Sequence, residues 1–278
     1  MGTIRIAILD LYAGHANEGM RCIREILEDI QNKHGIALSW DEFDVRNSIE
    51  IPGMQYDIYI SSGGPGSPLD NMGEDWDNAY FDWIQKVAKW NEDAEQINKK
   101  FVFFICHSFQ LACRYFEIGQ VTKRKSTSFG VFPIHWINAS ERDPVFQGLE
   151  DPFYGVDSRD FQVIQPDALR LEEIGGEILC LEKERPHIQL ERAVMAVRFN
   201  PWMIGTQFHP EADPRGMSMY LQQEEKKRNI IDNHGFEKWQ SMIDHLNDPD
   251  KIRLTHNQVL PNFILQSIAQ INYPYSLS

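Results

Sequence analysis

The chain has 278 residues, of which 42% are hydrophobic, and it carries a formal net charge of -14 at pH 7. A chain of this length can bury a full core, yet it is short for two domains of typical size. The acidic balance excludes the basic footprint that nucleic acid or an anionic membrane requires, so we expect neither as a partner.

The four cysteines, Cys22, Cys106, Cys113 and Cys180, show no Cys-x-x-Cys spacing. This indicates a reducing compartment and argues against structural zinc, and we expect no metal or cofactor. The sequence enters an apolar run at Ile4 without the layout of a signal peptide, and no apolar stretch is long enough to cross a bilayer. We expect a cytoplasmic protein.

Strands and helices are expected to alternate through the first part of the chain. Ile4–Leu9 is typical of a strand, Asn17–Lys33 of a helix, and Ala37–Val45 and Tyr56–Ser62 of two further strands. This order predicts an α/β fold with a doubly wound, mostly parallel sheet and helices on both faces. The ligand site of such a fold lies beyond the carboxyl ends of the strands.

A glycine-rich turn, Gly63-Gly-Pro-Gly-Ser-Pro68, follows the third of these strands. Such a turn lets backbone N–H groups approach a ligand closely, which suits half of an oxyanion hole. It lacks the Lys-Ser/Thr of a phosphate-binding loop and the glycine spacing of a dinucleotide site. Nucleotide binding is therefore not expected, although the turn alone is also compatible with a simple reversal of the chain.

Residues 70–100 are polar but carry aromatic and aliphatic side chains at helical spacing. We interpret them as an amphipathic helix near the pocket mouth. It could serve as a lid, as a partner surface or as the cover of one face of the sheet, and the last is favoured.

Cys106 is expected at a strand-to-helix junction, between the buried strand Phe101–Ile105 and a helix over Ser108–Phe116. A sharp turn there would lift the side chain clear of the sheet, and the positive end of the helix would favour a thiolate. The backbone N–H of His107 would point into the same space. The alternative is a buried structural cysteine.

His209 and Glu211 follow a second pair of strands, Arg192–Phe199 and Trp202–Phe208, joined by a tight turn at Asn200-Pro201. A carboxylate two residues from a histidine can hold its tautomer and stabilise the imidazolium. The two side chains could otherwise belong to an ordinary surface loop.

The glycine turn, the cysteine segment and Gln207-Phe-His-Pro-Glu211, in this order, resemble a class I glutamine amidotransferase domain over roughly residues 3 to 216. The resemblance implies the flavodoxin-like fold of that family. It also implies that Cys106 attacks the side-chain amide of glutamine, that His209 passes a proton to the departing ammonia, and that Glu211 orients His209. A thioester would form and water would release glutamate.

The same resemblance assigns binding roles. The backbone N–H groups of Gly64 and His107 would hold the oxyanion, and Gly66 and Gln110 would contact the bound glutamine. His107 also opens a rival mechanism, because an adjacent Cys-His pair resembles the protease branch of the same superfamily, in which that histidine serves catalysis.

The chain departs from the family pattern at the sharp turn that carries Cys106, here called the elbow, where Phe104 and Ser108 occupy two positions that are usually glycine. We expect Ser108 to narrow the pocket or to alter which amide fits.

Ser158 and Arg159 lie where many members carry a Ser-His-Gly-Asp-x-Val-like stretch that lines the glutamine site. Arg159 would then pair with a substrate carboxylate, or else it is an exposed arginine on a β-turn.

Residues 217–278 are expected to add a helical extension to a single domain, with helices near 222–231, 236–246 and 259–271. These residues are too few for an ATP-using synthase. Ammonia would therefore pass to a separate synthase subunit, or the protein would hydrolyse a γ-glutamyl or other amide on its own. A catalytically silent binding or regulatory module on the same fold is a further alternative.

Overall fold

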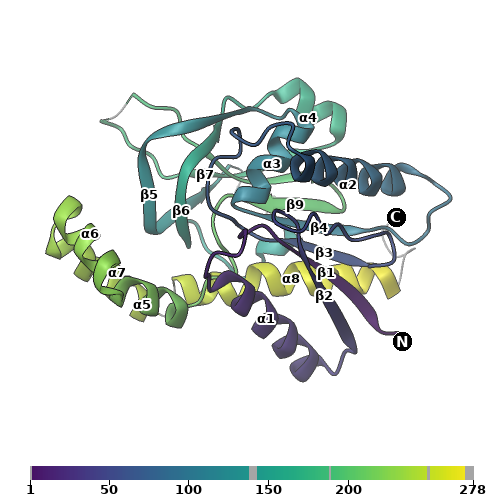
Figure 1. The fold of residues 1–278 in the computed structure, drawn as a ribbon, viewed down its shortest axis with the longest axis horizontal. Coiled ribbons are helices and arrows are strands. Elements are labelled where there is room, and N and C mark those ends of the chain that lie inside the picture. The colour runs from purple at the N-terminus through teal and green to yellow at the C-terminus, as the bar shows by residue number, and fades with distance from the viewer. Residues whose placement is uncertain (1, 138–142, 188, 249–250, 273–278) are drawn as a thin grey trace.

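A single mixed sheet runs through the computed structural model, which describes residues 2–137, 143–187, 189–248 and 251–272 (Figure 1). Within these residues the sheet has nine strands. From edge to edge they are β2 (Leu38–Asp44), β1 (Ile4–Asp10), β3 (Ile58–Ser61), β4 (Phe101–Ile105), β9 (Met203–Thr206), β8 (Val194–Asn200), β7 (Glu177–Glu182), β5 (Gln120–Trp136) and β6 (Phe153–Ile164).

The first five strands in this order are parallel, and the remaining pairings are antiparallel. The predicted α/β class is confirmed, and its parallel part is the half of the sheet built from βαβ crossovers. The other half is antiparallel because several consecutive strands there pair with each other without a crossover helix.

Helices cover both faces of the sheet. One face carries α1 (Gly19–His34) and α8 (Ile252–Asn272), and the other carries α2 (Asp75–Glu92), α3 (His107–Phe116) and α4 (Ala168–Ile174) (Figure 1). Neighbouring residues of β4 alternate between the two cores, Phe103 toward α8 and Phe104 toward α3. Strands buried on both faces explain the continuous apolar runs in the sequence.

The helix expected within residues 70–100 is α2, and its aromatic side chains cover the sheet. Trp76, Tyr80 and Trp83 are buried in the core beneath it. The favoured interpretation of this segment, a cover of one sheet face, therefore agrees with the structure.

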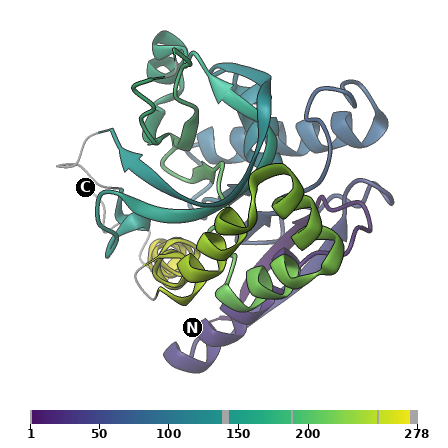
Figure 2. The same ribbon diagram turned by 90° about the vertical axis from the view of Figure 1, so that its left-hand side faces the viewer.

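Beyond β9 the chain forms α5 (Pro214–Gln222), α6 (Glu224–His234) and α7 (Phe236–Asn247), which extend away from the sheet (Figures 1 and 2). They join β5 and β6 through a small apolar core that includes Val131, Val156, Met217 and Leu221. Helix α8 then returns along the sheet and packs with α1 and the short 3-10 helix η1 (Pro144–Phe146). None of the helices in the described ranges has the length and apolar character needed to span a bilayer.

Candidate active site

The backbone at Cys106 adopts a conformation that residues with a Cβ rarely occupy. Cys106 has φ 49° and ψ -95° and stands between β4 and α3, where its N–H donates to the carbonyl of Thr206 at 2.8 Å. A residue held in such a region costs on the order of 1–3 kcal/mol and persists only where its surroundings fix it. The structure therefore places Cys106 on a strained strand-to-helix turn.

Ser108 stabilises this turn through hydrogen bonds to the ends of β3 and β4. Its hydroxyl accepts a hydrogen bond from the N–H of Ile105 at 2.8 Å and donates to the carbonyl of Ser61 at 2.7 Å. It is fully buried and does not line the pocket. The expectation that Ser108 narrows the pocket is wrong, because its side chain points into the junction between β3 and β4.

Phe104 also faces away from the pocket and lies in the core opposite Gly205, its partner on β9. A Cβ atom at Gly205 would lie 3.1 Å from the Cβ of Phe104 and 2.9 Å from Phe109 Cδ2. Gly205 therefore supplies the room that a large side chain needs beside the elbow. Neither Phe104 nor Ser108, the two residues that depart from the family pattern, lines the pocket.

His209 and Glu211 form a hydrogen-bonded pair at 2.8 Å between Nδ1 and Oε1. The Glu211 side chain is 1% exposed and that of His209 is 13% exposed. Burial alone would lower the pKa of His209, but the Glu211 carboxylate and the Cys106 sulfur outweigh it and raise that pKa well above its usual value. A protonated imidazole beside a sulfur is the arrangement that favours a thiolate.

Three helices hold the turn that carries Glu211. His256 of α8 lies with Nδ1 2.8 Å from the Glu211 carbonyl oxygen, so this nitrogen must be the protonated one. Arg21 of α1 forms an ion pair with Asp213 at 2.8 Å, and Asp213 also accepts a hydrogen bond from the N–H of Gly216 at the start of α5. The carboxylate is thus positioned from several sides.

Each glycine of the loop after β3 is required by its surroundings. A Cβ atom at Gly64 would lie 2.3 Å from the carbonyl oxygen of Leu11, and one at Gly63 would lie 2.7 Å from Cε1 of His209. Gly66 has φ 90°, a conformation that favours glycine. The loop therefore closely approaches both Leu11, which follows β1, and the histidine.

Arg46 fixes this loop to the body of the protein. Its guanidinium donates to the carbonyls of Pro65 at 2.6 Å and Leu11 at 3.3 Å, and it lies over the Trp76 ring at 5.1 Å. The loop backbone is thereby held in one place, as an oxyanion-binding loop needs to be.

These segments meet in a pocket of about 560 Å³ at the carboxyl ends of the parallel strands. The pocket lining includes every residue that the sequence analysis assigned to the site: Cys106, His209, Glu211, Gly64, His107, Gly66, Gln110, Ser158 and Arg159. The carbonyl oxygen of Ser158 lies 3.8 Å from the sulfur of Cys106.

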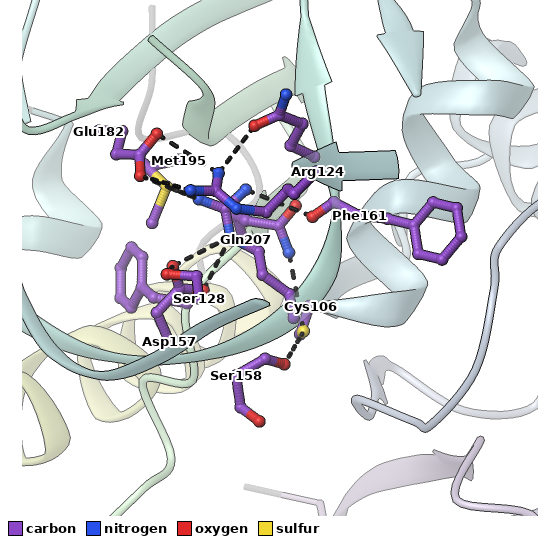
Figure 3. A network of polar contacts seen from close by, with 12 residues as sticks. Cys106, Arg124, Ser128, Asp157, Ser158, Phe161, Glu182, Met195 and Gln207 are labelled. Atoms are coloured by element: carbon purple, nitrogen blue, oxygen red, sulfur yellow. Dashed lines mark hydrogen bonds and ion pairs between the residues drawn. The ribbon is translucent and has the colours of Figure 1, made fainter. Parts of the chain in front are cut away.

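The side chain of Arg159 is committed inside the protein. It is 2% exposed, its Nε donates to Asp157 at 2.9 Å, and its guanidinium lies 3.9 Å from Glu182, which also pairs with Arg124 (Figure 3). The expectation of an exposed turn is wrong, because Arg159 lies buried in β6 and its partners in the structure are internal carboxylates. Pairing with a substrate carboxylate stays a prediction, since Arg159 also lines the pocket.

His107 is poorly suited to act as the base. Burial, together with the charges of Arg46 and Arg114, lowers its pKa to about 3. Its side chain is buried, and its Nε2 atom has no hydrogen-bond partner within the described part of the chain. A group with a pKa this far below the operating pH is a weak base, which argues against His107 in that role.

Sequence reasoning missed Tyr12, which lies in the loop after β1 and lines the pocket. A Cβ atom at Gly19 would lie 2.2 Å from its hydroxyl oxygen, and one at Gly63 would lie 3.3 Å from it. Burial and the Glu211 carboxylate raise the pKa of this hydroxyl well above its usual value. The position after the first strand of a doubly wound sheet was the available signal.

The fold and the pocket define an α/β protein that gathers a cysteine, a histidine-carboxylate pair and a glycine-rich loop at one sheet edge. Residues 21–227 match the family described as Glutamine amidotransferase class-I, and the chain belongs to that family. The resemblance drawn from the sequence is confirmed at this level. The comparison with curated proteins found no match.

Several solved structures share the fold. A glutamine amidotransferase from Thermotoga maritima matches with a TM-score of 0.65 at 13% identity, covering 95% of this chain and 98% of its own. The glutaminase domain of Trypanosoma brucei CTPS with bound acivicin gives 0.53 at 16% identity, over 75% and 86% of the two chains. A putative GMP synthase subunit from Thermoplasma acidophilum gives 0.51 at 16% identity, over 76% and 86%.

Proposed function

We propose that this protein hydrolyses the side-chain amide of glutamine through a thioester on Cys106 and releases glutamate and ammonia. The observation that carries this proposal is the meeting of a strained cysteine and the hydrogen-bonded His209–Glu211 pair in one pocket. Membership of the class I family supports the choice of glutamine.

In the first half of the reaction the Cys106 thiolate adds to the amide carbon. The oxygen becomes an oxyanion, which would accept hydrogen bonds from the backbone N–H groups of Gly64 and His107. His209 then gives its proton to the nitrogen, the C–N bond breaks, and ammonia leaves a thioester. Glu211 stabilises the imidazolium before that transfer.

In the second half water attacks the thioester. His209, now neutral, takes the proton from water, and the tetrahedral species collapses with release of the Cys106 thiolate and glutamate. The proton stays on His209, which returns the pair to its starting state.

We further propose that a separate subunit consumes the ammonia. A structural neighbour is described as a putative subunit of GMP synthase, which supports a divided enzyme. The part of the chain beyond β9 that the structure describes forms helices α5 to α8.

A second candidate, hydrolysis of a substituted γ-glutamyl amide without a partner, is favoured by the wall beside His209. The backbone N–H of His209 donates to the carbonyl of Val156 in β6. On the neighbouring strand β5, Phe129 packs against Tyr220 of α5 with ring centroids 5.3 Å apart. These residues and Met217 line the same pocket as His209. An apolar group on that nitrogen would bury surface against them.

The silent binding module is the least supported of the alternatives, because a binding protein has no use for a strained nucleophile with a matched base. Incubation with glutamine and with γ-glutamyl anilide, with glutamate, ammonia and aniline followed, tests all three. Cys106→Ala must abolish each signal, and activity in that variant would refute the mechanism. Release of glutamate from neither compound by the wild type would favour the binding module.

Glutamine and anilide also separate the two enzymatic candidates. A preference for glutamine supports coupling to a synthase. A preference for the anilide that is lost in Tyr220→Ala supports the stand-alone amidase, and Met219→Ala, an exposed position on the same helix, is the matched control.

A further inference from the structure

Gln207 is a buried side chain beside the nucleophile that the mechanism above does not use. It follows β9, two residues before His209, and is fully buried. Its Nε2 atom lies 3.7 Å from the sulfur of Cys106 (Figure 3). An amide N–H at that position can donate to the sulfur, and it does so most strongly when the sulfur is negative.

The orientation of the Gln207 amide is fixed through Gln110, whose own orientation is set by the backbone carbonyl of Phe161. The carbonyl oxygen of Phe161 can only accept hydrogen bonds, and it lies 3.2 Å from Nε2 of Gln110 and 3.5 Å from the Arg159 guanidinium. Gln110 must therefore present its NH₂ group on this side. The same NH₂ group donates to Oε1 of Gln207 at 3.0 Å. With its oxygen engaged, Gln207 turns its own NH₂ group toward Cys106.

We propose that Gln207 is a catalytic residue that stabilises the Cys106 thiolate by donating a hydrogen bond to it, and that Gln110 is a positioning residue that holds Gln207 in this orientation. Ser158 acts in the opposite sense, because its carbonyl oxygen, 3.8 Å from the sulfur, accepts only from the protonated thiol. The inference rests on the proposed function in that this thiolate is the nucleophile of the reaction.

The hydrogen bond from Gln207 would assist both the formation and the hydrolysis of the thioester. It raises the fraction of thiolate before attack, and it weakens once the sulfur is acylated and neutral. When the tetrahedral species of the second half collapses, the sulfur regains its charge as the leaving group, and the bond re-forms. Gln207 would thus assist the release of glutamate as well as the attack.

The test follows alkylation of Cys106 by iodoacetamide across pH, with peptide mass spectrometry to separate Cys106 from the other three cysteines. In Gln207→Met the pH of half-maximal alkylation rate should rise by about one unit, the tenfold effect of a lost hydrogen bond to a charged group. In the isosteric Gln207→Glu it should rise further, because an acceptor replaces the donor. Gln31→Met, at an exposed position of α1, is the control and should behave as the wild type.

Gln110→Met tests the positioning half of the proposal, since Gln110 is not in hydrogen-bond contact with the sulfur. It should shift the alkylation profile in the same direction as Gln207→Met but by less. If Gln110 only contacts the substrate, as the family resemblance implies, this variant will raise KM and leave the alkylation profile unchanged, which overturns its positioning role.

Wild-type alkylation profiles in Gln207→Met and Gln207→Glu, with thermal midpoints showing both to be folded, would overturn the role of Gln207. If the methionine variant does not fold, the isosteric glutamate variant and Gln110→Met decide. Alkylation needs no amide hydrolysis, so a wild type that cleaves no amide refutes the proposed function and leaves this measurement to give its own answer.

Discussion

At the scale of single residues, two histidines flank the nucleophile in surroundings of opposite character. His209 pairs with a buried carboxylate, which raises its pKa, whereas burial, together with the charges of Arg46 and Arg114, lowers the pKa of His107. The sequence alone offered both as bases. The choice depends on the burial of His107 and on the nearby charges of Arg46 and Arg114, which the sequence does not place beside it.

The two histidines can be compared directly. We expect His209→Asn to lower kcat/KM for the amide substrate by about 10²- to 10⁴-fold, the usual contribution of a positioned acid-base group. His107→Asn should lower it far less, because the backbone N–H that serves the oxyanion is retained. Initial rates of glutamate release check this at matched thermal stability. Comparable residual activity in His209→Asn and the wild type would move the role to His107.

Gly64 offers a second test at this scale. A Cβ atom there would meet the backbone carbonyl of Leu11, so Gly64→Ala must displace either the glycine loop or the segment that follows β1. We expect a loss of about 10² in kcat through a displaced oxyanion donor, with little change in KM. Gly53→Ala is the matched control, because the atom that its Cβ would meet is the end of the flexible Gln55 side chain. Equal kcat in the two variants would contradict a role for the loop in the reaction.

At the scale of elements, sequence patterns predicted β1 to β4, β8 and β9, most of the helices and the three segments that form the pocket. They gave no bounds for β5, β6 and β7. A buried strand such as Phe101–Ile105 can be predicted because it is apolar throughout. Helix α1 can be predicted from the helical spacing of its apolar residues. Helix α5 was missed, although Asp213-Pro214 is a cap followed by proline at the first helical position. The contacts of Gln207, Arg21 and His256 could not be predicted, because they join segments far apart in sequence through tertiary packing.

Asp213 connects α5, α1 and the turn that carries Glu211. We expect Asp213→Ala to destabilise the protein by about 1 to 3 kcal/mol, through loss of a helix cap and of a half-buried ion pair. It should also lower kcat, because the carboxylate that orients His209 is then held less firmly. Urea unfolding and initial rates well below the thermal midpoint measure the two effects.

The control for Asp213 is Glu42→Ala. It removes the ion pair between Glu42 of β2 and Arg24 of α1, which is more exposed than the pair between Arg21 and Asp213. We expect this change to cost less than about 1 kcal/mol and to leave kcat unaltered. If Asp213→Ala lowers stability but leaves kcat at the wild-type value, the turn does not need α5 to position Glu211.

At the scale of the whole molecule, the buried ionisable groups respond to acid in opposite directions. The raised pKa of His209 contributes stability that is present at low pH and is lost as pH rises through its folded-state value. For Glu182, burial acts to raise the pKa, but Arg159 and Arg124 outweigh it and lower the value. Its contribution is therefore present above its usual pKa and lost in acid. The contribution of His107 to stability is also lost in acid, because folding buries this side chain in its neutral form.

His107 therefore predicts part of the acid sensitivity of the fold. Its pKa is about 3 in the folded protein and about 6.5 in an unfolded chain. Between these values only the unfolded state binds the proton, so stability falls as pH decreases. From pH 6.5 to 4.5 the loss from this one group is about 2 kcal/mol. His107→Gln removes that proton site and keeps a polar side chain of similar size. We expect urea unfolding at the two pH values to show a loss in the wild type that exceeds the loss in His107→Gln by this amount. Equal losses would mean that His107 is accessible to protons in the folded state, and the rival base would then regain a claim to the reaction.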